Sequence, residues 1–207
     1  MQRFVADAPP ASLVDSTAAV YLANDTAIVP TLSHVFSSAE FAGSAGAKVR
    51  RPFEHLVAML RTLGSTVEAA ADSNGAGSIR SLLSAGGHTP YAWPNPDGYP
   101  DTADHWVSAY GLLQRWSAAG RIAGNSVNGI RSDLAGLVAS PLPATAGELV
   151  DQLASRLLDG PVTPAEREAA LVVLGRAAGD YVADLDPTGG LRSLVGVLLS
   201  SPSFQLR

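Results

Sequence analysis

Apolar residues recur at helical spacing along most of the chain, and no long stretch alternates with the two-residue period of a β-strand. The clearest run follows Pro52, where apolar side chains return every three or four positions as far as Leu63, and Gly64 ends it. A proline at the first helical position and a glycine just after the last one are typical helix boundaries. This pattern predicts a helix between them.

The same criterion predicts further helices on both sides of this run. They are expected over residues 11–23, 25–36, 79–83, 101–119, 145–157, 163–174 and 186–199. Residues 65–71 can also be helical. The 101–119 segment is expected to carry an apolar face with these members: Trp106, Val107, Tyr110, Leu113 and Trp116.

Four of these helices begin at residues that suit an N-cap. Asp25 precedes the second helix and Asp101 precedes the long one. Thr145 and Thr163 are each followed three positions later by glutamate, which is the spacing of a capping box.

The prediction is therefore an all-α fold, an irregular bundle of about eight to ten helices with one long Pro/aromatic loop over residues 86–101. The sequence Pro141-Leu142-Pro143 predicts a division into a helical core, residues 1–140, and a C-terminal helical subdomain, residues 141–207. We expect the second part to pack on the first as one structural unit.

The loop concentrates the large aromatic residues of this region. Tyr91, Trp93, Tyr99 and the nearby Trp106 can form a binding platform, with Asp97 beside them, because flat rings with polar tips suit wet interfaces. The alternative, which we favour, is that Trp93 and Tyr99 plug the core while the prolines stiffen the loop.

Titratable residues in the same region provide the candidates for chemistry. His88, Asp101 and His105 are candidate catalytic residues, and the last two can share one helix face. No recognised metal-ligand spacing and no Gly-x-Ser-x-Gly elbow occurs, so we predict no metal ion and no cofactor. Turn and capping roles are the favoured interpretation of the aspartates.

Three basic residues, Lys48, Arg50 and Arg51, lie just before the helix start at Pro52, where the helix dipole disfavours positive charge. They can mark an anion site or a partner contact, but a solvated linker is the favoured interpretation. His34 and His55 fall on amphipathic helices, where half-buried surface positions are expected.

Composition narrows the functional classes. Hydrophobic residues make up 46% of the chain and charged residues only 16%, which is typical of a folded helical protein with a fairly neutral surface. The net charge of -5 and the lack of a basic block argue against nucleic-acid binding. The absence of cysteine excludes disulfides and thiolate chemistry, and no apolar run is long enough to predict a membrane span.

Two segments of similar sequence close predicted helices, residues 35–41 (VFSSAEF) and 198–204 (LLSSPSF). Each has an apolar pair, two serines, a spacer and a phenylalanine. We expect a helix-ending turn whose phenylalanine folds back onto the apolar face.

These segments, with Asn24-Asp25-Thr26, residues 48–54 (KVRRPFE), residues 93–101 (WPNPDGYPD) and Gln205, resemble the C-terminal part of the bacterial family known as domain of unknown function 1800. The resemblance implies a largely helical protein that is often exported and, in most members, roughly twice as long. It assigns no activity, so no catalytic residue is transferred.

The favoured hypothesis is a non-catalytic helical module of a longer, exported bacterial protein with a structural or partner-binding role. Its partner would be the N-terminal part of the same protein or another protein. The alternative is a hydrolase acting on an extracellular or cell-envelope polymer, with its site near the Pro/aromatic loop.

Overall fold

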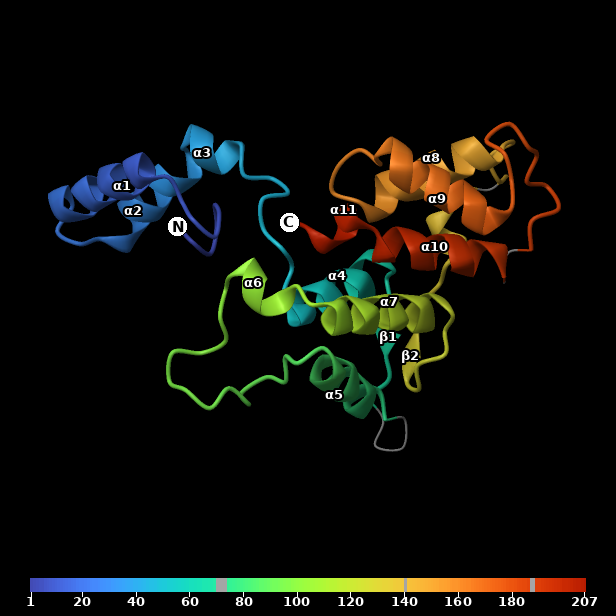
Figure 1. Cartoon of the computed structure of the whole chain (residues 1–207), viewed down its shortest axis with the longest axis horizontal. Coiled ribbons are helices and arrows are strands. Elements are labelled where there is room, and N and C mark those ends of the chain that lie inside the picture. Colours follow the sequence, from blue (N-terminus) through green and yellow to red (C-terminus); the bar gives the residue numbers. More distant parts are fainter. Residues whose placement is uncertain (70–73, 140, 187–188) are drawn as a thin grey trace.

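The computed structural model describes residues 1–69, 74–139, 141–186 and 189–207. Within these ranges the chain forms eleven α-helices, one 3₁₀ helix and a two-stranded sheet (Figure 1). The α-helices are α1 Ala11–Ala23, α2 Ile28–Phe36, α3 Ala39–Ala42, α4 Pro52–Thr62, α5 Gly75–Ala85, α6 Ala103–Trp106, α7 Ala109–Ala123, α8 Ala146–Leu157, α9 Pro164–Leu174, α10 Gly190–Ser200 and α11 Pro202–Gln205. The prediction of an irregular all-α bundle is confirmed.

The sheet is small and joins two connecting segments. β1 (Thr66–Val67) pairs antiparallel with β2 (Ile130–Arg131), and the 3₁₀ helix η1 (Ala135–Leu137) follows β2. The expectation that 65–71 is helical is therefore wrong at 66–67, where β2 supplies the backbone partners; 70 and 71 lie outside the described residues.

Helix α10 lies at the centre of the main body, with α7 on one side and α8 and α9 on the other (Figure 1). Its contact with α7 is close because glycines face each other: a Cβ added at Gly196 would meet the Cα of Gly120 at 3.6 Å. Helix α4 packs against α7, and α5 packs against α4.

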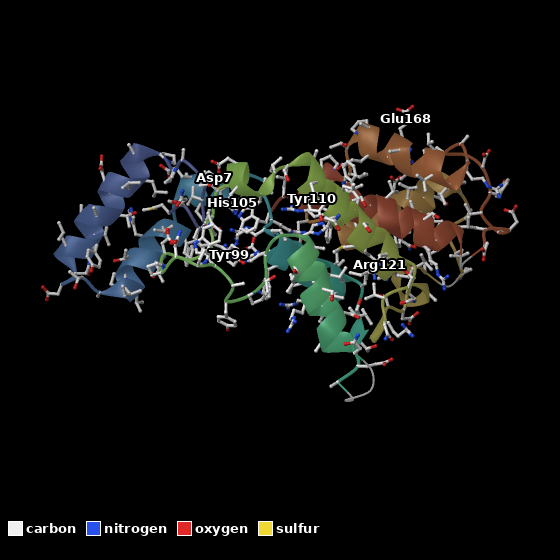
Figure 2. The ribbon with its side chains drawn as sticks, turned by 60° about the horizontal axis from the view of Figure 1, so that its bottom comes forward. Asp7, Tyr99, His105, Tyr110, Arg121 and Glu168 are labelled. Atoms are coloured by element: carbon white, nitrogen blue, oxygen red, sulfur yellow. The ribbon has the colours of Figure 1, made fainter. Side chains whose placement is uncertain are left out.

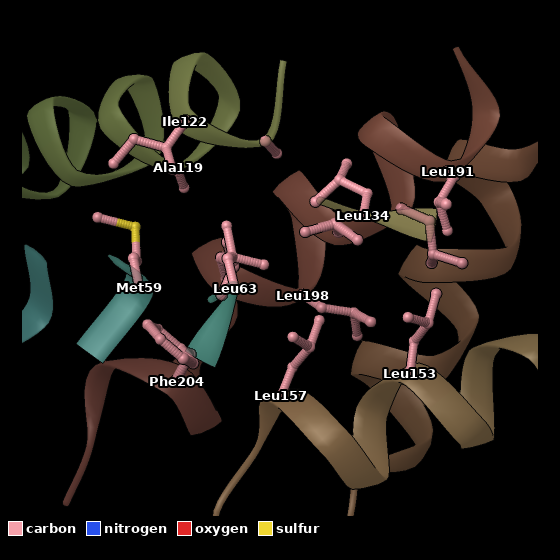
Figure 3. Packing of buried hydrophobic residues seen from close by; sticks show 14 of the residues in the cluster. Met59, Leu63, Ala119, Ile122, Leu134, Leu153, Leu157, Leu191, Leu198 and Phe204 are labelled. Atoms are coloured by element: carbon pink, nitrogen blue, oxygen red, sulfur yellow. The ribbon is translucent and has the colours of Figure 1, made fainter. Parts of the chain in front are cut away.

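The main core is built on these helices and includes residues from both sides of the predicted boundary near residue 141. It extends from Leu56 on α4 to Phe204 on α11, and Figure 3 shows Ile122, Leu157 and Leu198 among its members. All five side chains are at least 96% buried. The boundary itself stays a prediction.

The first two helices form a hairpin that lies apart from this body (Figure 1). Its own cluster of buried apolar residues is small and consists of Val5, Leu13 and Val35, with Phe41 packed against it. A cluster of this size stabilises the hairpin far less than the main core stabilises the body.

Two predicted helix starts are wrong. Asp25 is no N-cap, because Asp25 and Thr26 have positive φ values of 46° and 63° and α2 begins after Ala27. Asp101 is no N-cap either: Thr102 precedes α6, and the expected long helix breaks at Ser108. The Ser108 hydroxyl accepts the Gly111 N–H at 3.0 Å and so starts α7 as a separate helix.

The expected turn in the two similar segments is confirmed. Ser38 caps α3 by accepting the Phe41 N–H at 3.1 Å, and Ser201 caps α11 by accepting the Phe204 N–H at 3.3 Å. Each phenylalanine folds back onto its local core, Phe41 in the hairpin and Phe204 in the body.

The last residues of the chain pair with the segment that leads into α4. Val49 and Leu206 form an antiparallel bridge, the Arg207 N–H donates to the Lys48 carbonyl at 2.8 Å, and the Arg50 N–H donates to the Gln205 carbonyl at 2.8 Å. We call residues 201–207 the C-terminal strap. It fixes the connector between hairpin and body.

Phe204→Ala should lower the free energy of unfolding by about 3–5 kcal/mol, because it removes a buried ring from the core. The control Leu113→Ala removes a side chain that is 57% exposed, and should change stability by no more than about 0.5 kcal/mol. Urea unfolding of both variants measures the difference, and equal losses would contradict the assignment of Phe204 to the core.

Candidate functional site

The loop before α6 folds against the N-terminus of α4, with His88 as its buried anchor. The His88 Nδ1 accepts the Phe53 N–H at 3.3 Å, so the imidazole satisfies one of the unpaired amides at the start of α4. Its ring stacks on Trp106 with centroids 4.8 Å apart, and the Trp106 Nε1–H donates to the Pro100 carbonyl at 2.8 Å. His88 and Trp106 are 8% and 5% exposed and form the buried plug, so the favoured interpretation that Trp93 and Tyr99 form it is wrong.

Trp93 and Tyr99 are half-buried beside this plug. The Tyr99 hydroxyl donates to the Thr89 carbonyl at 2.9 Å, and its ring centroid lies 4.5 Å from that of His88. The Trp93 Nε1–H donates to Asp97 at 3.1 Å, and its ring packs 4.9 Å from Tyr99. Asp97 therefore orients Trp93 within an aromatic layer that reaches the surface.

The remaining predicted site residues do not converge. Tyr91 is fully exposed and has a φ of 62°, and His105 is exposed at the edge of the aromatic layer (Figure 2). Within the described ranges, no three His, Asp or Glu side chains come together as metal ligands. His88 and His105 both pack against Trp106, whereas Asp101 faces Arg3, so these three side chains do not form one centre.

Asp101 belongs instead to a cluster of ion pairs. Its Oδ1 accepts a hydrogen bond from Arg3 at 2.8 Å, and the charged nitrogens of Lys48, Arg51 and Arg207 lie 3.6, 3.6 and 3.8 Å from the carboxylate. Two further carboxylates complete what we call the junction cluster. Its members are Arg3, Asp7, Lys48, Arg51, Glu54, Asp101 and Arg207.

This cluster joins the hairpin to the body. Asp7, labelled in Figure 2, accepts the Ala103 N–H at 2.7 Å and pairs with Lys48 at 2.5 Å. Arg3 pairs with Glu54 at 2.5 Å. Asp7 thereby supplies the first turn of α6 with the acceptor expected from Asp101. Nearby, a pocket of about 450 Å³ opens between Phe4, Phe41 and the basic side chains of Lys48 and Arg207.

The interpretation of Lys48, Arg50 and Arg51 as a solvated linker is wrong, since Lys48 and Arg50 are 3% and 8% exposed. Arg50 donates to the Phe204 carbonyl at 3.0 Å, lies over the Phe204 ring and pairs with Asp159. These partners are distant in sequence, which is why the local pattern did not reveal them.

His55 is 1% exposed, so its expected position at the surface is also wrong. Its Nε2 lies 3.0 Å from the Gln205 amide nitrogen, and its ring also hydrogen-bonds the backbone of Leu199. The Gln205 amide oxygen in turn accepts from Arg115 at 2.9 Å. This buried relay connects α4, α7 and the strap.

Burial governs the titration of both histidines. It lowers the pKa of His55 to about 3 and that of His88 to about 4, and the charges of Arg115 and Arg51 respectively add to the effect. Both rings are therefore neutral at neutral pH. A base with so low a pKa is a poor general base near pH 7.

The hairpin presents an exposed apolar surface. Its members, which we call the hairpin surface, are Val14, Tyr21, Leu22, Ile28, Val29, Leu32 and Phe36, from 37% to 76% exposed. The apolar face predicted for residues 101–119 is also largely exposed, so that prediction is wrong: Val107, Tyr110, Leu113 and Trp116 are 48% to 64% exposed. The opposite face, with Ala119 and Ile122, is the buried one.

The profile of a family described as "Protein of unknown function (DUF1800)" matches residues 1–206. The chain belongs to this family. The match includes the hairpin, every member of the junction cluster except Arg207, and nearly all of the strap. No curated protein and no solved structure matches the chain. In the part of the chain that is described, no helix is both long and apolar enough to cross a membrane.

Acid should destabilise this DUF1800 protein in a range set by the two histidines. Below pH 6.5 the unfolded chain binds protons that the folded chain does not, so stability falls from pH 6.5 to between pH 4 and 3. At about 1.4 kcal/mol per pKa unit the combined loss is several kcal/mol. His88→Asn keeps an acceptor for the Phe53 N–H and should flatten the dependence of the free energy of unfolding on pH. The control His34→Asn should not flatten it. Identical pH profiles of stability for both variants would contradict this account.

Asp101→Asn should destabilise the fold by roughly 2 kcal/mol or more, because it removes the carboxylate shared by four cationic side chains in a mostly buried cluster. The control Asp184→Asn breaks an exposed pair with Arg176 and should have no measurable effect. Urea unfolding at low salt provides the comparison, and a neutral Asp101→Asn would show that the cluster does not hold the junction.

Proposed function

We propose that this chain is a non-catalytic helical module that binds a helical segment of a protein through the hairpin surface. The observation that supports this most directly is that the apolar positions of α1 and α2 lie exposed, with Leu22 73% and Val29 76% accessible. Soluble proteins rarely leave large apolar patches uncovered, and those that do commonly use them for binding. Export of the protein is part of the proposal on the strength of the family resemblance alone.

The chemistry of the partner follows from the surroundings of this surface. Residues 8–47 contain the carboxylates Asp15, Asp25 and Glu40 and no lysine or arginine. An apolar face with an acidic surround fits an amphipathic helix whose apolar stripe is flanked by Lys or Arg. The same charge disfavours an anionic membrane surface as the occupant.

The hydrolase alternative has less support. It needs accessible acid–base groups near the Pro/aromatic loop, whereas His88 is buried against Trp106 and Asp101 is engaged with Arg3. His105 is accessible, but its ring packs against Trp93 and Trp106 at centroid distances of 5.5 and 4.5 Å.

Binding of designed helical peptides tests the proposal. An amphipathic peptide of about 20 residues, long enough to form a helix, is made with a leucine stripe and either a lysine or a glutamate flank. The lysine peptide should bind at least roughly tenfold more tightly than the glutamate peptide. Fluorescence anisotropy of labelled peptides gives both dissociation constants.

A pair of matched variants locates the binding. Leu22→Ser with Val29→Ser should weaken binding of the lysine peptide by roughly tenfold or more. Val172→Ser with Val173→Ser alters two exposed valines on α9, 73% and 44% accessible, and should leave binding unchanged. Equal losses in both double variants, equal affinity for both peptides, or preferential binding to anionic phospholipid vesicles would contradict the proposal.

A further inference from the structure

A second exposed apolar surface lies on the outer side of α7. Its members, which we call the α7 surface, are Val107, Tyr110, Leu113 and Trp116, from 48% to 64% exposed. The last three recur every three positions and so follow one side of the helix. Because soluble proteins rarely leave large apolar patches uncovered, this surface and the hairpin surface both indicate a binding partner.

A groove of about 530 Å³ extends the α7 surface between α7 and α10. Trp116 lines it, with its Nε1–H donating to the Ser200 carbonyl at 3.0 Å, and so do Gly120 and Gly196. A Cβ added at Gly120 would have no atom of a packed neighbour within 4 Å, so the groove is open above this glycine. The side chains of another molecule therefore have room to enter it.

Exposed arginines flank this groove. Arg192 lines it, and Arg121 follows Gly120 on α7 (Figure 2). Among the described residues, neither arginine forms an ion pair. The carboxylate of Asp104 lies at the opposite end of the surface, on α6. The groove end of the α7 surface is therefore positively charged and favours a partner that carries carboxylates.

The tip of the hairpin matches this surface in polarity and charge. Leu22 and Val29 lie on either side of the turn between α1 and α2, at the end of the hairpin farthest from the body (Figure 1). They are 73% and 76% exposed, and Asp25 in the turn between them forms no ion pair with any described residue. Because the tip points away from the body, the α7 of the same molecule is out of its reach.

We propose that the hairpin tip of one copy docks on the α7 surface of a second copy of this chain, with Leu22 and Val29 entering the groove beside Gly120. This inference rests on the proposed function, because it names a second copy as the protein that the hairpin surface binds. The contact joins two different faces, so it either closes as two reciprocal contacts or extends as an open chain.

The contact is expected to be weak because it involves few side chains. A Kd on the order of 10–100 µM is typical of such small interfaces, so the protein is a monomer at the low concentrations of a peptide titration.

Sedimentation velocity of the full chain tests the self-association. The weight-average sedimentation coefficient should rise with protein concentration over about 5–500 µM. Leu22→Ser with Val29→Ser should raise the Kd at least roughly tenfold. Gly120→Glu should do the same, since its carboxylate fills the groove and repels Asp25 of the second copy.

Gly120→Glu should also keep the fold, because it replaces a glycine within a helix at a position with open space. Its matched control is Gly179→Glu, which adds the same charge where an added Cβ is equally free. The control should associate like the unaltered protein.

Mixing the two defective variants distinguishes this contact from any other. Leu22→Ser with Val29→Ser leaves the α7 surface intact, and Gly120→Glu leaves the hairpin intact, so the mixture retains one complementary contact. A labelled Gly120→Glu chain should therefore bind the hairpin variant at least roughly tenfold more tightly than it binds another Gly120→Glu chain. The lysine-flanked peptide should displace the hairpin variant by occupying the hairpin surface.

The outcomes separate this inference from the proposed function. A chain that binds the lysine peptide but stays monomeric up to about 500 µM would overturn the second copy as partner and leave the binding role standing. The inference also fails if Gly120→Glu associates as strongly as Gly179→Glu, or if the mixed variants bind no better than either variant alone. Self-association that needs both surfaces, without binding of the lysine peptide, would support the second copy and contradict the peptide chemistry of the proposed function.

Discussion

The pairing of the C-terminal strap with residues 48–50 is the interaction on which the rest of the molecule depends. It brings the C-terminal end of the chain to the start of α4, where Arg50 donates to the Phe204 carbonyl at 3.0 Å and lies 4.8 Å above its ring. From there, Gln205 connects to His55 and Arg115 inside the body, while Arg207 faces Glu54 and Asp101 in the junction cluster. A short backbone pairing between segments that are distant in sequence thus positions the buried relay on one side and the junction cluster on the other.

The body and the hairpin are therefore stabilised by different kinds of interaction. The body is held by a continuous apolar core that runs through α4, α7, α8 and α10. The hairpin has only a small core of its own and is tied to the body through charged side chains, chiefly Arg3 and Asp7. Its apolar positions are exposed, and this exposure is the basis for the binding role that we propose for it.

The sequence predicted the helices well because periodicity, capping boxes and the Pro52 and Gly64 boundaries are local signals. It did not predict which face of a helix is buried when both carry apolar or small residues, as in α7, where Ala119 and Ile122 are inside and Leu113 is outside. Nor did it locate the partners of Lys48 or Asp101, because they come from distant segments. Arg115 lies at helical spacing from Ala118, Ala119 and Ile122 on α7, and this spacing was the one sequence signal that could have indicated its burial.

The most direct test of the central claim is native-state hydrogen exchange measured segment by segment. Amides of α4, α7 and α10 should exchange only at the global free energy of unfolding, while those of α1 and α2 should open at a clearly lower one, since they rest on a small core and polar links. Addition of the lysine-flanked helical peptide should raise protection in α1 and α2 first. Hairpin amides as protected as those of α10 in the free protein, or unchanged when the peptide is bound, would contradict this account.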